Sequence, residues 1–242
     1  MSEAKTSILG HLRELRNRLI NSVIAIAVGT GVAFWKYSWL IDKLQSPAPE
    51  NVKFIYTKAA EGFSVSMRVS FIAGIVIAMP VIMYNLFMFI LPALHTREKR
   101  VVLLILPWVL LMFFGGVLFG YYVLLPPALN FLLNFGADVA EYMLTLGEYV
   151  GFVTRLLLIV GLAFELPVVT TFLVRIGVVS HRWLANKRKI VIILSFVASA
   201  AITPTPDAFN QSIVAATLIV LYELSIWLAW LMEKRKKVAE ST

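Results

Sequence analysis

Three glutamates lie in surroundings that are unusual for a carboxylate, two of them in basic segments and one in an apolar run. Glu14 and Glu98 are each the only acid in a short basic segment, residues 11–19 and 91–100. Glu165 stands in the apolar run 164–167, where a charge at membrane depth costs about 2.5–3.5 kcal/mol. In the ordinary interpretation, Glu14 and Glu98 balance charge on the surface, where a Glu14 to Arg18 pair is worth about 0.3–0.5 kcal/mol. Glu165 is then a neutral buried carboxyl group. Their functional interpretation is polar recognition of another molecule.

The sequence offers little for catalysis. It has no cysteine, and no two of its histidines, His11, His95 and His181, have the spacing of metal ligands. No glycine-rich phosphate loop occurs, and no serine–histidine or paired-aspartate arrangement falls at one membrane depth. We therefore expect no enzyme, no catalytic residue, no metal and no cofactor. The net charge of +8 is typical of basic cytoplasmic loops rather than of nucleic-acid binding.

Long apolar blocks must position these glutamates. The 242 residues are 60% hydrophobic and 15% charged, whereas a soluble domain is nearer half apolar and a quarter charged. Blocks of about 20 apolar residues cross a bilayer as helices, because lipid leaves no other partner for the backbone. The sequence predicts an all-α membrane protein, a single membrane domain over residues 1–242. Its six predicted spans cover about 19–40, 63–94, 101–125, 149–174, 190–202 and 208–232, with loops at 41–62 and 175–189.

Basic residues set the predicted orientation. Most of the 22 lysines and arginines fall in the N-terminal segment 1–18, in the segments near 97–100 and 175–189, and in the tail 233–242. The positive-inside rule then places both termini in the cytoplasm. The last two helices are predicted to be short, and the fifth, at about 20 Å, is shorter than the hydrocarbon core. Between them, we expect Thr205 as N-cap of the last helix, Pro206 at its first position and Asp207 at its positive end.

These segments together resemble the TatC family, the multi-spanning receptor of the twin-arginine protein translocase. The resemblance covers nearly the whole chain and rests on the order and spacing of its motifs. At the last turn the family commonly has Thr-Pro-Pro-Asp, and this chain carries one additional residue there. The matching residues are His11-Leu12, Glu14-Leu15-Arg16, Arg18-Leu19, Phe63, Pro80, Phe89, Pro92-Ala93-Leu94, Glu98, Phe164-Glu165-Leu166-Pro167, Thr203-Pro204 and Pro206-Asp207.

The resemblance implies a receptor in the plasma (cytoplasmic or inner) membrane that binds twin-arginine signal peptides of folded proteins and nucleates the export complex. Glu14 and Glu98 match the acids that hold the arginine pair, Arg16 and Phe89 match supporting positions, and Glu165 matches a polar contact for signal peptide or partner helix. It further implies single-span TatA- and TatB-type partners, a homo-oligomeric receptor complex in membrane lipid, and the proton-motive force as energy source.

Elementary chemistry agrees with that assignment, because a guanidinium presents a rigid fork of donors that a carboxylate accepts and an ammonium does not match. Two other classes of function stay open from the residues alone. One is an ion-coupled secondary transporter using Glu165, Arg155 or Glu223, which the lack of an internal repeat disfavours. The other is a passive membrane scaffold in which Glu14 and Glu98 only balance charge.

Overall fold

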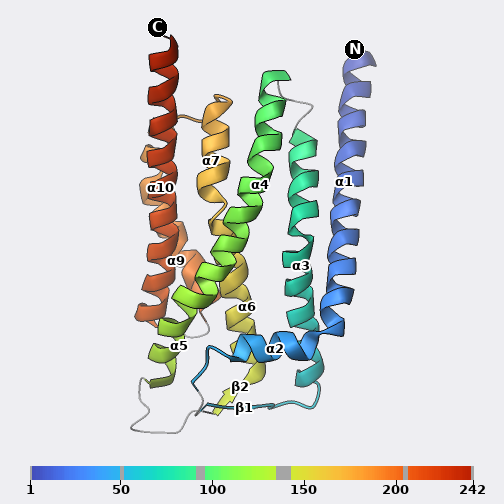
Figure 1. Cartoon of the computed structure of the whole chain (residues 1–242), viewed down its shortest axis with the longest axis vertical. Helices are drawn as coiled ribbons and strands as arrows, with labels where there is room; N and C mark the ends of the chain where they lie inside the picture. Colours follow the sequence, from blue (N-terminus) through green and yellow to red (C-terminus); the bar gives the residue numbers. More distant parts are fainter. Residues whose placement is uncertain (1, 50–51, 91–95, 135–142, 204–206, 241–242) are drawn as a thin grey trace. The chain divides into compact units, whose positions relative to one another are not determined.

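The computed structural model describes residues 2–49, 52–90, 96–134, 143–203 and 207–240, with side chains described over 10–49, 52–89, 105–133, 143–203 and 207–234 (Figure 1). The chain divides into two compact units, one of residues 1–40 and 66–110 and one of residues 41–65 and 111–242. The elements are α1 (Ser2–Trp35), α2 (Tyr37–Gln45), β1 (Lys53–Ile55), α3 (Glu61–Ile90), α4 (Thr96–Phe119), the π-helical segment η2 (Gly120–Leu124), α5 (Leu125–Asn134), β2 (Met143–Thr145), α6 (Leu146–Ala163), α7 (Leu166–Arg175), α8 (His181–Asn186), α9 (Arg188–Ile202) and α10 (Ala208–Glu240).

Five segments of the described chain are long and apolar enough to cross a membrane: Gly10–Trp35, Glu61–Phe89, Ile105–Leu133, Leu146–Arg175 and Ala208–Lys234. The predicted fifth span corresponds to α9, whose 15 residues extend about 22 Å. A sixth span and the orientation of the termini therefore stay predictions. The prediction that both last helices are short is wrong for α10, which has 33 residues.

Two predicted loops contain regular structure. The segment 41–62 holds the end of α2 and the strand β1, which pairs in parallel with β2. The segment 175–189 holds α8, where the Ser180 side chain accepts a hydrogen bond from the backbone of Trp183. Both helices are shorter than any membrane span, so hydropathy over a long window does not detect them.

The third predicted span does not stop at Pro126 and Pro127. These prolines occupy the first turn of α5, where the fixed φ of proline suits a helix. The π-helical segment η2 directly precedes them, and a π-bulge changes the hydrogen-bond spacing that prolines would otherwise interrupt. The helical path consequently continues to Asn134.

In the first unit, α1 approaches α3 closely at a pair of glycines. A Cβ atom on Gly29 would lie 2.7 Å from the backbone oxygen of Gly74, and one on Gly74 would lie 2.5 Å from the backbone nitrogen of Thr30. Neither distance is compatible with a side chain unless the helices separate. Glycine is therefore required at both positions for this contact, as in other closely packed membrane helices.

In the second unit, α10 packs along α7 and α9. A buried cluster of Val174, Leu184, Tyr222, Ile226 and Ala229 joins α7, α8 and α10. The Tyr222 hydroxyl donates to the backbone oxygen of Leu184 at 2.7 Å, which fastens α8 to α10 as well.

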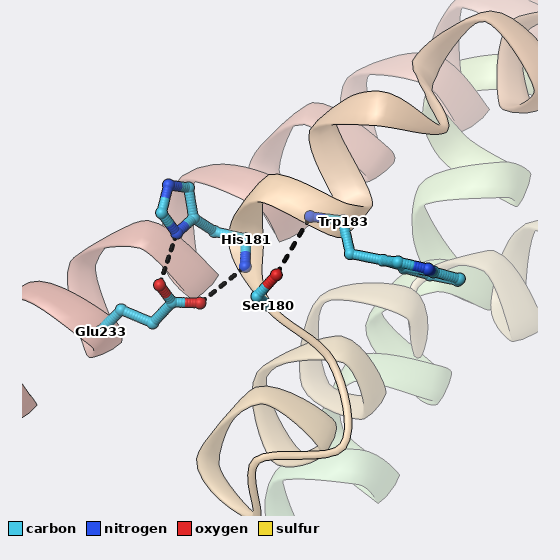
Figure 2. A network of polar contacts seen from close by, with 4 residues as sticks. All are labelled: Ser180, His181, Trp183 and Glu233. Carbon is cyan, nitrogen blue, oxygen red and sulfur yellow. Dashed lines mark hydrogen bonds and ion pairs between the residues drawn. The ribbon is translucent and has the colours of Figure 1, made fainter.

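Two carboxylates of α10 extend these ties. Glu233 accepts from the backbone nitrogen of His181 and contacts its Nδ1, each at 2.6 Å (Figure 2). Glu223, whose role the sequence left undecided, accepts from Arg188 Nε at 2.7 Å and Nη2 at 2.9 Å. These hydrogen bonds and the charge of Glu223 raise the pKa of the Arg188 guanidinium.

Candidate functional site

Glu14 lies on the side of α1 that contacts α3. His11 and Ser22 lie on the same stripe of α1, since residues 11, 14, 18 and 22 recur at three- and four-residue intervals. The ring of His11 stacks on Phe89 of α3, with centroids 4.3 Å apart and planes inclined by 17°. Further along, Asn85 Nδ2 donates to Ser22 Oγ at 3.2 Å. The Glu14 carboxylate is thus held between two contacts with α3.

The Glu14 carboxylate already binds a guanidinium. Arg18 Nε donates to Glu14 Oε1 at 2.9 Å and Nη2 donates to the same oxygen at 2.5 Å, the i,i+4 pair that the sequence predicts. Among the described residues no donor reaches Oε2. The backbone oxygen of Arg18 accepts from Ser22 Oγ at 3.0 Å, which continues the polar chain toward Asn85.

The other three predicted residues of this site differ in how well the structure places them. Phe89 is half-buried beneath His11. Arg16 is exposed and stands about 200° around α1 from Glu14, so it does not share the Glu14 stripe. Glu98 lies in the first turn of α4, where the positive end of the helix dipole favours an acid, but its side chain is outside the described residues.

Glu165 occupies the joint between α6 and α7 in the second unit. Two turn residues, Phe164 and Glu165, separate these helices, and Pro167 follows in the first turn of α7. The side chain is 6% exposed. Its two carboxyl oxygens have no hydrogen-bond partner in the described part of the chain, although the backbone of Phe113 in α4 approaches them. The Glu165 carboxyl group can therefore still form a hydrogen bond with another molecule.

The turn before α10 is capped differently from the prediction. Asp207 precedes the first helical residue, and its Oδ1 accepts from the backbone nitrogen of Asn210 at 2.7 Å. That is the hydrogen bond of an N-cap residue, so Asp207 takes the role that the sequence assigned to Thr205. Thr205 and Pro206 lie outside the described residues.

Sequence reasoning missed three residues that hold the Glu14 surface. It excluded His11 as a metal ligand and matched it to the family without a role, and it gave no role to Ser22 or Asn85. Asn85 offered a signal, as an amide in the apolar second half of the span 63–94, and the structure buries it. Among the described residues no group of three histidine, cysteine or acidic side chains is placed to hold a metal ion.

A family model and several relatives of this chain agree on one family. A family model described as Sec-independent protein translocase protein (TatC) matches residues 10–216. A relative from Aquifex aeolicus is 40% identical over 233 residues, 94% of this chain and 96% of the relative, and one from Carboxydothermus hydrogenoformans is 34% identical over 230 residues, 95% of each. Both are Sec-independent protein translocase proteins TatC.

A solved structure gives the same result. A crystal structure described as the twin arginine translocase receptor TatC superposes with a TM-score of 0.85 at 39% identity, covering 91% of this chain and 98% of the other. The resemblance in the motifs, the match along most of the chain and the shared fold agree, and the chain belongs to the TatC family of Sec-independent protein translocase proteins.

Proposed function

We propose that this chain is a receptor for twin-arginine signal peptides of folded proteins, which it binds at a surface built from residues 11–18 of α1, the first turn of α4 and the last turns of α3. Glu14 and Glu98 receive the two arginines, and Phe89 holds the neighbouring part of α1 through His11. Arg16 adds to the basic charge around the acids. By nucleating the export complex, the chain acts in transport rather than in catalysis.

The observation that carries this proposal is the hydrogen-bonding state of Glu14. Its Oε1 accepts two N–H groups of one guanidinium, so the position and rotamer of this carboxylate suit an arginine side chain. Its second oxygen, Oε2, accepts no hydrogen bond from the described residues and can accept one from an incoming arginine. A lysine ammonium would place one donor where a guanidinium places two, which gives a physical reason for a preference for arginine.

Glu165 has a separate role in the proposal. Burial of a carboxyl group without a hydrogen bond is unfavourable, and a polar group from another membrane helix would satisfy it. We assign Glu165 to contact with the signal peptide or with a single-span TatA- or TatB-type subunit. Several copies of the chain assemble in a receptor complex in the inner membrane, with both termini cytoplasmic, and the proton-motive force drives transport.

The test is binding of a twin-arginine signal peptide to the purified chain in detergent, beside a twin-lysine peptide of otherwise identical sequence. We expect a clear preference for arginine that E14Q and E98Q each abolish, because losing one partner of a partly desolvated charge pair costs about 2–5 kcal/mol. The exposed Glu148 offers a matched control, since E148Q removes the same charge from another part of the chain. Equal binding of both peptides, or unchanged affinity in E14Q and E98Q, would refute the assignment.

A further inference from the structure

An apolar groove of about 310 Å³ runs along α9 in the second unit. Four helices, α6, α7, α9 and α10, contribute to its walls. Its one polar lining residue is Ser195, whose hydroxyl donates to the backbone oxygen of Val191 at 2.8 Å. An occupant therefore meets no unsatisfied hydrogen-bonding group along this wall. The main lining residues are Leu162, Leu166, Val191, Leu194, Ala198 and Leu218.

From Val191 to Ala198 the groove follows about 10 Å of α9. Its apolar walls suit a hydrocarbon chain, which buries no hydrogen-bonding group against them.

The N-terminal end of the groove is basic. Lys187 and Arg188 continue the α9 stripe formed by Val191, Leu194 and Ala198, because they precede Val191 by four and three residues. Arg182 and Lys189 are exposed close by in sequence. This end of α9 therefore concentrates positive charge one helical turn from the apolar groove.

The acid at this end, Glu223, orients Arg188. It holds Nε and Nη2, whereas Nη1 has no hydrogen-bond partner among the described residues, and the Arg188 side chain is about half exposed. The Lys187 ammonium lies 5.7 Å from the centroid of the Trp183 ring. Trp183 is 52% exposed, and its indole points away from Glu233 (Figure 2). Exposed tryptophan beside lysine and arginine is typical of a membrane–water interface.

We propose that this groove binds an anionic phospholipid, with one acyl chain along α9 and the phosphate at Lys187 and Arg188. Basic pockets between membrane helices take anionic headgroups, and a phosphate matches the remaining donors of a preoriented guanidinium. A bound lipid would also compensate for the short α9, because a helix of 15 residues is shorter than the hydrocarbon core of roughly 30 Å. A bound lipid would hold the bilayer surface at the level of the Lys187–Arg188 turn. The proposal stands independently of signal-peptide recognition.

The experiment is native mass spectrometry of the full chain in detergent, titrated with phosphatidylglycerol and, separately, with phosphatidylcholine carrying the same acyl chains. We expect phosphatidylglycerol to bind more tightly. Lys187→Gln, which leaves the Arg188–Glu223 pair intact, should weaken it about fivefold, and the double variant K187Q/R188Q should weaken it about 25-fold, since each surface cation contributes about fivefold. Lys189→Gln is the matched control, because it removes one charge from the neighbouring position off the stripe and should change binding little.

A second variant separates the acyl chain from the headgroup. Ala198→Phe fills the groove without changing any charge, and we expect it to reduce binding of both lipids. Equal binding of the two lipids by the wild type, or equal losses in K187Q and K189Q, would overturn the proposal. So would an A198F chain that keeps its lipid but no longer copurifies with a single-span membrane partner, because the groove would then seat a protein side chain.

Discussion

Replacing Arg18 with glutamine tests how Glu14 is used. Arg18 donates both of its recorded hydrogen bonds to Glu14 Oε1, so an arriving arginine finds one carboxylate oxygen occupied and one open. If Arg18 competes with the ligand, R18Q should bind a twin-arginine peptide more tightly. If Arg18 instead holds Glu14 in its productive position, R18Q should bind more weakly.

The expected gain is small and can be estimated. The Arg18 and Glu14 side chains are 24% and 31% exposed, and an i,i+4 pair of this kind is worth about 0.3–0.5 kcal/mol. The pair is then formed roughly two-thirds of the time, and its removal raises the affinity of a competing arginine about threefold. Loss of the Glu14 carboxylate in E14Q acts in the other direction and is larger, at least about 30-fold for 2 kcal/mol or more.

Fluorescence anisotropy of a labelled twin-arginine peptide resolves a threefold difference. R13Q is the control, since it removes the same positive charge from an exposed neighbour and reports only the change in long-range repulsion. We expect R18Q to exceed R13Q in affinity by about threefold at low salt, with a smaller difference as salt screens the pair. A loss of affinity in R18Q comparable to that in E14Q would refute competition and make Arg18 a positioning residue.

Three further predictions follow from contacts elsewhere in the chain. Gly74→Val should lower the melting temperature in detergent, because its Cβ meets the backbone of Thr30 and overpacking costs about 1–3 kcal/mol. Gly31→Ala should leave the melting temperature unchanged, since no atom lies within 4 Å of the new Cβ. Equal melting temperatures of the two variants would contradict the close helix contact. Glu165→Ala should keep its melting temperature, since it breaks no hydrogen bond among the described residues, while export in a complemented strain should fall; normal export would remove Glu165 from the mechanism. A reporter fused after Thr242 should be active in the cytoplasm, and activity on the other side of the membrane would overturn the predicted orientation.

Hydropathy predicted the long helices because a membrane span needs about 20 apolar residues, a signal that survives errors at either end. It did not predict that α1 begins at Ser2, since that early segment is polar and its helical state depends on the helix that follows. It also missed β1 and β2, three residues each. Strands this short owe their conformation to a partner far away in sequence, which no local pattern records.

The candidate site divides in the same way. The Glu14–Arg18 pair was predictable because four residues bring two side chains together on any helix. The stacking of His11 on Phe89 and the hydrogen bond from Asn85 to Ser22 join residues more than 60 positions apart, so spacing alone gives no sign of them. The Asp207 cap was missed for a local reason, because both Thr205 and Asp207 are good N-cap residues and only the start of α10 decides between them.

The placement of Glu14 therefore depends on α3 more than on α1 itself. Only 11% of an 18-residue apolar window within Gly10–Trp35 is buried, so side-chain burial contributes little to fixing this helix. Thr30 of α1 lies against Gly74 of α3. His11, Ser22 and Gly29 make three further contacts with α3, at intervals of eleven and seven residues. Eleven residues make about three turns and seven about two, so all three fall on one stripe of the helix, and Glu14 falls on it as well. Contacts along this stripe fix the position of Glu14, and its side chain, 31% exposed, stays accessible to a peptide that arrives from outside.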